Sequence, residues 1–221
     1  QSSAELARAG VSYLRKNLKS RNAPRMARSL GVGGATGLGS IVYALTLMAN
    51  CLRDGSLLAD AHVAAELFTD DLIGQARTGM GKTFAFGVPL LHRIVTDESR
   101  PLTGIPRALI VVPTRELCLQ VYDDLANAAK YLTVGDSKLS VTSIYGGRPY
   151  EPQIEALQKG VDVVVGTPGR LLDLAQQGHL QLGGLSVLVL DEADEMLDLG
   201  FLPDIERILK QIPTDRQAML F

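Results

Sequence analysis

The chain has 221 residues, 46% of them apolar, which is enough to bury one substantial core and argues against wholesale disorder. Its formal net charge is −2, so overall charge does not indicate a nucleic-acid partner, and any site for a polyanion has to be local. The spacing of Cys51, Cys118 and the three histidines predicts no zinc site, and no apolar run reaches membrane-spanning length. We therefore expect a cytoplasmic protein with buried, reduced thiols.

Residues 1–30 are basic, with seven Lys or Arg against one acid, Glu5. Leu6, Val11, Leu14 and Leu18 recur at near-helical spacing, which favours an amphipathic helix with a solvated basic face. A polyanion-binding arm and a targeting peptide stay open as alternatives.

The remainder of the first 70 residues also has a helical pattern. Apolar stripes over 41–52 and 57–68 flank a short polar turn, which suits a helical hairpin. The glycine-rich run at 31–39 is superficially like a dinucleotide loop, but the basic residues before it are not strand-like, so we assign it no cofactor. We expect an all-helical segment over residues 1–70.

The pattern changes near residue 71, where apolar β-branched runs begin to alternate with helical stretches. The predicted strands are 71–73, 108–112, 140–145, 161–165, 185–190 and 217–221, and the predicted helices are 81–95, 115–131, 151–158, 169–177 and 203–211. This alternation predicts an α/β fold with a parallel sheet flanked by helices. Ligands of such sheets bind at the carboxyl ends of the strands.

A phosphate-binding loop is predicted between the first strand and the helix that follows it. Its residues are Ala76, Arg77, Thr78, Gly79, Met80, Gly81, Lys82 and Thr83. Glycines let backbone amides converge on phosphate oxygens at a helix N-terminus, Lys82 adds a positive charge, and the Thr83 hydroxyl can ligate magnesium. A glycine-rich turn without a ligand is the alternative, but the Gly-Lys-Thr ending is specific.

Three acids follow the buried apolar run 185–190, namely Asp191, Glu192 and Asp194. Like charges at one strand end need a cation or hydrogen-bond donors to offset their repulsion. A magnesium ion bound through Asp191 would do so, and Glu192 would then be placed to deprotonate an attacking water. A solvated acidic turn is the alternative.

Residues 71–221 resemble the first RecA-like domain of DEAD-box RNA helicases. The resemblance rests on the tetrad at 191–194, the loop at 76–83, Pro113-Thr114-Arg115 with the two residues after it, Gly146-Gly147, and residues 167–170. It implies a RecA-like P-loop domain that uses ATP and Mg²⁺, with Lys82, Asp191, Glu192 and Asp194 in catalysis. It also implies sequence-independent RNA contacts by Pro113, Thr114, Arg115, Gly146, Gly147, Thr167, Pro168, Gly169 and Arg170.

Residue chemistry agrees with an RNA-facing role for these segments. Thr114 and Thr167 each precede a predicted helix, so we expect both to cap it and Pro168 to occupy a first helical turn. Arg115 and Arg170 add charge-assisted donors for phosphate. Plain helix capping with exposed arginines is the alternative.

The chain departs from the family pattern at both ends. No glutamine lies between Gln1 and Gln75, so the segment that reads adenine in this family has no counterpart. The family's Ser-Ala-Thr segment and second RecA-like domain, which are expected partners of this chain, do not follow residue 221. We therefore expect weak ATP hydrolysis and no duplex unwinding by this chain alone.

Residues 31–73 are similar instead to a helical stretch of lanthionine synthetase C-like domains, without the zinc ligands of that family. This second resemblance suggests a chimera with a junction near residue 71, and a divergent amino-terminal extension is the alternative. A non-catalytic chimera and half of a DNA-directed P-loop translocase remain the competing functions.

Overall fold

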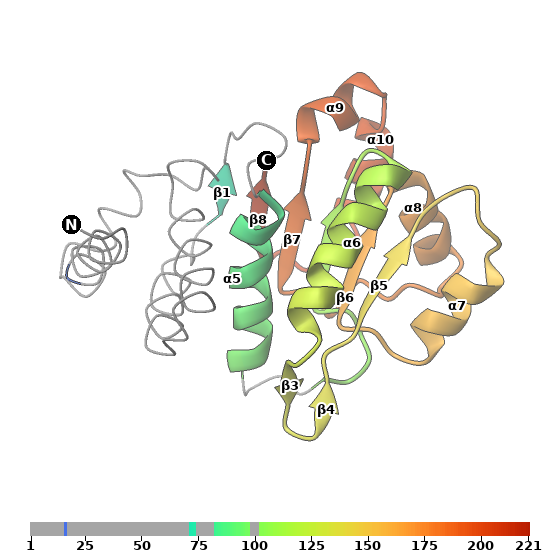
Figure 1. The fold of residues 1–221 in the computed structure, drawn as a ribbon. Helices are drawn as coiled ribbons and strands as arrows, with labels where there is room; N and C mark the ends of the chain where they lie inside the picture. Colours follow the sequence, from blue (N-terminus) through green and yellow to red (C-terminus); the bar gives the residue numbers. More distant parts are fainter. Residues whose placement is uncertain (1–15, 17–70, 74–81, 98–101) are drawn as a thin grey trace. The chain divides into compact units, whose positions relative to one another are not determined.

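The structure is a computed structural model that describes residue 16, residues 71–73, residues 82–97 and residues 102–221. Six parallel strands form one sheet in the order β1-β8-β7-β2-β6-β5 (Figure 1). These strands are β1 (Leu72–Ile73), β2 (Ala108–Val111), β5 (Val141–Ile144), β6 (Val163–Gly166), β7 (Val187–Leu190) and β8 (Gln217–Leu220). All six predicted strands are confirmed, each slightly shorter than its apolar run.

The helices of the described residues alternate with these strands along the chain. They are α5 (Lys82–Thr96), α6 (Arg115–Ala129), α7 (Glu151–Gln158), α8 (Pro168–Gln176), α9 (Ala193–Asp198) and α10 (Leu202–Leu209). The five predicted helices are confirmed, and α9 is an addition. None of the helices in the described stretches is long and apolar enough to cross a bilayer.

Residues 82–92 belong to one compact unit, and residues 71–73 and 93–221 belong to a second unit that contains the whole sheet. The predicted helical segment 1–70, apart from the exposed helical residue Lys16, lies outside the described residues, as does the loop at 74–81.

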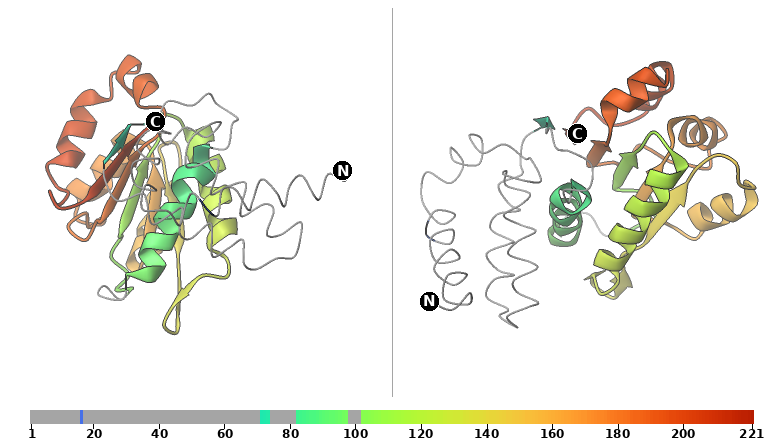
Figure 2. Two further views of the ribbon diagram at one scale, coloured as in Figure 1. Left: turned by 90° about the vertical axis from the view of Figure 1, so that its left-hand side faces the viewer. Right: turned by 45° about the horizontal axis from the view of Figure 1, so that its top comes forward.

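Burial explains why the central strands read as unbroken apolar runs. Every residue of β2, β6 and β7 is buried, because both faces of these strands are covered. On one face, a single core joins strand residues such as Leu109 and Leu188 to residues of α7, α8, α9 and α10. Helix α6 packs on β5 and β6, and Figure 2 shows the sheet separating α6 from α9 and α10. Burial raises the pKa of the Cys118 thiol of α6 to about 12.

A short antiparallel hairpin between α6 and β5 was not predicted. It pairs β3 (Thr133–Val134) with β4 (Ser137–Lys138) across a two-residue turn, in which Gly135 has φ +58°. Strands of two residues are too short to show the alternation by which a strand is recognised in sequence.

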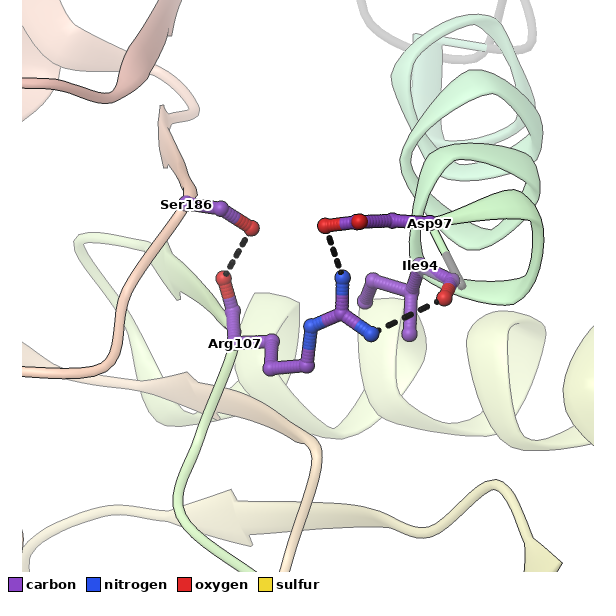
Figure 3. Close-up of polar contacts among 4 residues, drawn as sticks. All are labelled: Ile94, Asp97, Arg107 and Ser186. Carbon is purple, nitrogen blue, oxygen red and sulfur yellow. Dashed lines mark hydrogen bonds and ion pairs between the residues drawn. The ribbon is translucent and has the colours of Figure 1, made fainter. Parts of the chain in front are cut away.

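The amino-terminal edge of the sheet is held by buried charged side chains. Arg107, immediately before β2, is 4% exposed, donates from Nη2 to Asp97 Oδ2 at 2.7 Å, and donates from Nη1 to the Ile94 carbonyl at 3.0 Å (Figure 3). Its own carbonyl accepts from Ser186 Oγ at 3.1 Å. Asp162, before β6, is similarly buried and accepts two hydrogen bonds from the residue before β5. Both charged side chains are hydrogen-bonded within the fold. The residues predicted to take part in chemistry lie at the opposite edge of the sheet.

Candidate functional site

The predicted site residues of the sheet unit all follow strands at its carboxyl edge. Thr114 comes after β2, Gly146 after β5, Thr167 after β6 and Asp191 after β7. Strands β7, β2, β6 and β5 are consecutive neighbours in the sheet, so these segments lie side by side along one edge (Figure 1). The prediction that the motifs share one edge is confirmed for these segments.

The acids after β7 combine burial with an unusual backbone. Asp191 is 2% exposed, its N–H donates to the Val111 carbonyl at 3.0 Å, and its Oδ1 accepts from the Glu192 N–H at 3.1 Å. Glu192 has φ 54° and ψ 50°, and it is the one non-glycine residue with positive φ among those the structure describes. That left-handed conformation costs about 1–2 kcal/mol for a residue with a side chain, and such strain concentrates at functional sites. Asp194 is exposed in the first turn of α9.

Lys82 and Thr83 are the first two residues of α5. Lys82 is only 7% exposed, and Thr83 is half-buried. A buried ammonium group requires charged or hydrogen-bonding partners, which is the behaviour expected of a phosphate-loop lysine. The other predicted loop residues, 76–81, lie outside the described residues, so the cradle itself stays a prediction.

A cluster of arginines and tyrosines occupies the edge at the ends of β2 and β5. The Tyr145 ring is 2% exposed, and the guanidinium groups of Arg115 and Arg148 lie 5.2 and 5.5 Å from its centroid. Arg148 Nη1 also donates to Tyr145 Oη at 2.9 Å. Gly147, with φ +77°, lies beside Arg115, because a Cβ at this glycine would be 3.9 Å from Arg115 Nη1. The two predicted segments 113–115 and 146–147 are therefore brought together.

Arg170 joins the loop after β5 to the first turn of α8. Its guanidinium lies 3.9 Å from the centroid of the Tyr150 ring, and Nη1 and Nη2 donate to the Arg148 carbonyl at 3.0 and 3.1 Å. Tyr150 Oη donates to Asp173, and this hydrogen bond raises the pKa of Tyr150. The predicted segment 167–170 is thereby tied to the loop that holds Gly146 and Gly147.

Gln153 holds both ends of the same loop from beneath. It is 5% exposed, its Oε1 accepts from the Tyr145 N–H at 3.0 Å, and its Nε2 donates to the Pro149 carbonyl at 3.0 Å. A buried amide with both ends satisfied fixes the course of a loop that has no strand or helix of its own.

The two threonine caps differ. Thr114 caps α6 as predicted, since its Oγ1 accepts from the Leu117 N–H at 3.2 Å. Thr167 occupies the N-cap position of α8 with Pro168 in the first turn, but its side chain makes no cap hydrogen bond, so that prediction is wrong. Spacing places a threonine at the cap, whereas its side-chain rotamer decides whether the hydroxyl reaches an amide. Pro113 is buried, and Gly169 is exposed.

Sequence reasoning missed Tyr145, Arg148, Tyr150 and Gln153. The signal available for three of them was a run of two aromatic and one basic residue around Gly146-Gly147, a composition typical of nucleic-acid surfaces. Gln153 had no such signal, because its role depends on being buried under the loop.

Comparison with known proteins agrees with this geometry. Residues 59–221 match the family described as DEAD/DEAH box helicase. The chain is 49% identical to the DEAD-box ATP-dependent RNA helicase 3A, chloroplastic, of Zea mays over 68% of its own length and 20% of that protein. It is 46% identical to the DEAD-box ATP-dependent RNA helicase CshA of Streptococcus pneumoniae over 76% of its own length and 30% of that protein.

Solved structures give the same result. The yeast DEAD-box splicing factor Prp28 superposes with a TM-score of 0.67 at 31% identity, over 80% of this chain and 43% of that one. A DEAD box protein from the hyperthermophile Methanococcus jannaschii superposes with a TM-score of 0.58 at 42% identity, over 69% of this chain and 39% of that one.

The chain spans between 20% and 32% of the length of the curated relatives. The match to the family begins at residue 59, twelve residues before the boundary predicted near residue 71, and continues to the last residue. Because the matched region covers well over half of the sequence, the chain belongs to the DEAD/DEAH box helicase family.

Proposed function

We propose that this chain is the ATP- and RNA-binding half of an ATP-dependent RNA helicase. The observation that carries the proposal is the gathering of a buried aspartate, a strained glutamate and an arginine-rich loop cluster at the carboxyl edge of one parallel sheet. This edge is where open α/β sheets bind their ligands.

The nucleotide would be held by residues 76–83, with backbone amides on its phosphates and Lys82 on the β- and γ-phosphates. Thr83 and Asp191 are proposed as the magnesium ligands. They fit this ion because hydroxyl and carboxylate oxygens are the hard ligands that Mg²⁺ prefers. The described residues contain no group of three or more His, Cys, Asp or Glu side chains that could hold a metal. That suits an ion shared with substrate phosphates and water, which would neutralise charge on the transferring phosphoryl group.

Glu192 is proposed as the group that orients and deprotonates the attacking water. Its left-handed backbone supports this role, since the sheet unit sustains a conformation that a structural glutamate would avoid. Asp194, exposed two residues later, is proposed to act with the second RecA-like domain of the family rather than with residues of this chain.

RNA would bind through its backbone to the segments 113–115, 146–147 and 167–170. Contacts of this kind give affinity that depends on salt and not on base sequence. In this family a second domain supplies arginines to the transition state, so these 221 residues assayed alone would hydrolyse ATP slowly, since losing such a group costs about 10³–10⁵ in the rate of phosphoryl transfer.

The domain division is also a proposal: a helical segment over 1–70, either a lanthionine synthetase C-like fragment or a divergent extension, and a truncated RecA-like domain over 71–221. The family match from residue 59 favours a junction earlier than residue 71. Separate expression of residues 59–221 tests it, because a cooperative melting transition equal to that of the full chain would show that 1–58 contribute nothing to the domain.

The decisive experiment is titration of the chain with a fluorescent ATP analogue and Mg²⁺. Lys82→Ala should abolish binding, while Lys138→Ala, an exposed lysine on β4, should not change it. Melting curves without nucleotide show whether either variant has lost its fold. Unchanged affinity in Lys82→Ala would refute the phosphate cradle.

The melting midpoint of the chain should rise with ATP and magnesium, because a ligand that binds only the native state stabilises it. No shift would favour the non-catalytic chimera. A parallel titration with RNA and DNA of equal length separates an RNA helicase half from a DNA-directed translocase half.

A further inference from the structure

Two exposed arginines contact the ring of one buried tyrosine, Tyr145. Its ring is almost completely buried, yet Arg115 from the first turn of α6 and Arg148 from the loop after β5 are both exposed and flank it. A cation within about 6 Å of the centroid of an aromatic face is attracted to the ring, so Tyr145 holds both guanidinium groups in place.

Neither arginine of this pair is neutralised by the fold. Within the part of the chain that the structure describes, no carboxylate lies within ion-pair distance of Arg115 or Arg148. Asp173, the acid of the neighbouring helix, is occupied by the Tyr150 hydroxyl. Two exposed positive charges beside Gly147 therefore have no anionic partner among the described residues.

Arg148 is fixed at both its side chain and its backbone. Nη1 donates to the Tyr145 hydroxyl, and its carbonyl accepts both guanidinium donors of Arg170. Two of the donors of Arg170 are thus directed at the loop, and its flat face is stacked on Tyr150. Both of these hydrogen bonds of Arg170 hold the loop in place, whereas the exposed guanidinium of Arg148 is hydrogen-bonded through Nη1 alone among the described residues.

We propose that Arg148 binds a phosphate of a single-stranded RNA backbone next to the one proposed for Arg115, so that the two arginines form a clamp across Tyr145. Arg170, besides the RNA contact proposed for its segment, then acts as a positioning residue for Arg148. The inference rests on the proposed RNA-binding function, which already includes Arg115, and adds to it a phosphate contact at Arg148, which lies outside the family motifs. Guanidinium groups suit this task because their planar forks bind phosphate oxygens in bidentate fashion.

The test is the salt dependence of binding to a fluorescently labelled single-stranded oligouridylate, measured by anisotropy with the 221-residue chain. Losing one phosphate contact should reduce the slope of log K against log salt by about 0.7, which is about fivefold in affinity at 0.1 M salt. Arg148→Gln and Arg115→Gln should each show this loss. Arg207→Gln, an exposed arginine of α10, is the matched control and should not.

Tyr145→Phe separates the clamp from a general effect of charge. It removes the hydroxyl that holds Arg148 and keeps the ring and every charge. In the wild-type background it should weaken RNA binding, and in the Arg148→Gln background it should have no further effect. Additive effects, or a wild-type slope in Arg148→Gln, would overturn the clamp while leaving RNA binding intact. Failure of the unmodified chain to bind the RNA would overturn the proposed function and the clamp together.

Arg170→Gln tests the positioning role by the same logic. The backbone carbonyl of residue 148 is still present in Arg148→Gln, so the two hydrogen bonds from Arg170 to that carbonyl persist in this variant. If Arg170 also acts through Arg148, its substitution should weaken binding more in the parent chain than in the Arg148→Gln background. An equal loss in both backgrounds would overturn the positioning role and leave Arg170 as a direct phosphate contact alone.

Discussion

The two edges of the parallel sheet use the same residue types in opposite ways. At the amino-terminal edge, Arg107 and Asp162 are 4% and 3% exposed, and each is hydrogen-bonded to residues distant in sequence. At the carboxyl edge, Arg115 and Arg148 are exposed, and their guanidinium groups contact an aromatic ring and its hydroxyl. Burial with partners makes an arginine structural, whereas exposure with a fixed orientation prepares it for a ligand.

The acids follow the same rule. Asp162 accepts from both the N–H and the hydroxyl of Ser140 at 2.8 Å, so both groups of this serine are used by the fold. Glu192 instead stands in a left-handed conformation, at the point where the chain passes from β7 into α9. Changes at Arg107 or Asp162 should therefore lower stability, whereas changes at Glu192, Arg115 or Arg148 should lower turnover or RNA binding with stability preserved.

The largest effect is expected from Glu192→Gln at the carboxyl edge. The amide keeps the shape of the side chain but cannot take a proton, so residual ATP turnover should fall by about 10²–10⁴ while nucleotide affinity is kept. Single-turnover hydrolysis of radiolabelled ATP measures it. Glu195→Gln, an exposed acid on α9, serves as control. Equal turnover in Glu192→Gln and the parent would exclude Glu192 as the base.

At the amino-terminal edge, Arg107→Met should lower the free energy of unfolding by about 3 kcal/mol, because it leaves Asp97 and the Ile94 carbonyl without their charged donor. Asp97 is 30% exposed, so water offsets part of the loss. Urea unfolding measures it, and Arg207→Met on the surface of α10 should change stability by less than about 0.5 kcal/mol.

The comparison would be weakened if Arg107→Met left stability unchanged, since the buried arginine would then be no more structural than an exposed one. It would also be weakened if RNA affinity per folded molecule fell, because the two edges would then not be separable.

A glycine pair sharpens the role of the amino-terminal edge. Gly104 has φ +76°, and a Cβ there would stand 2.8 Å from the Gly160 Cα, whereas Gly135 has φ +58° with nothing within 4 Å. Gly135→Ala should cost only the left-handed strain, about 1 kcal/mol. Gly104→Ala should cost about 2 kcal/mol, since it adds a clash between two backbones. Equal melting midpoints in the two variants would mean that the close approach yields at no cost.

Sequence was most informative where one short segment contains the whole signal. The runs that became β2, β6 and β7 are apolar throughout because both faces are buried, and the acids after β7 follow such a run directly. It was least informative where partners are far apart in the chain. Arg107 meets Ser186 from 79 residues away, and nothing near either residue indicates the contact.

The carboxyl edge shows both cases. Residues 113–115, 146–147 and 167–170 could be found as local patterns, but the cation–π contacts of Arg115 and Arg148 with Tyr145 depend on β2 and β5 both flanking β6. Side-chain rotamers are a further limit, since Thr114 and Thr167 have the same position relative to their helices and only Thr114 forms the cap.

That difference gives the smallest predicted effect. Thr114→Ala should lower the free energy of unfolding by about 1 kcal/mol, the usual value of an N-cap hydrogen bond. Thr167→Ala should lie within about 0.5 kcal/mol of the parent, because its hydroxyl caps nothing. Urea unfolding of the two variants, each with an RNA titration, tests both halves of the argument. If Thr167→Ala weakens RNA binding without loss of stability, the uncapped first turn of α8 binds a phosphate. If it destabilises the chain as much as Thr114→Ala does, Thr167 has a structural role, as Arg107 and Asp162 have at the opposite edge.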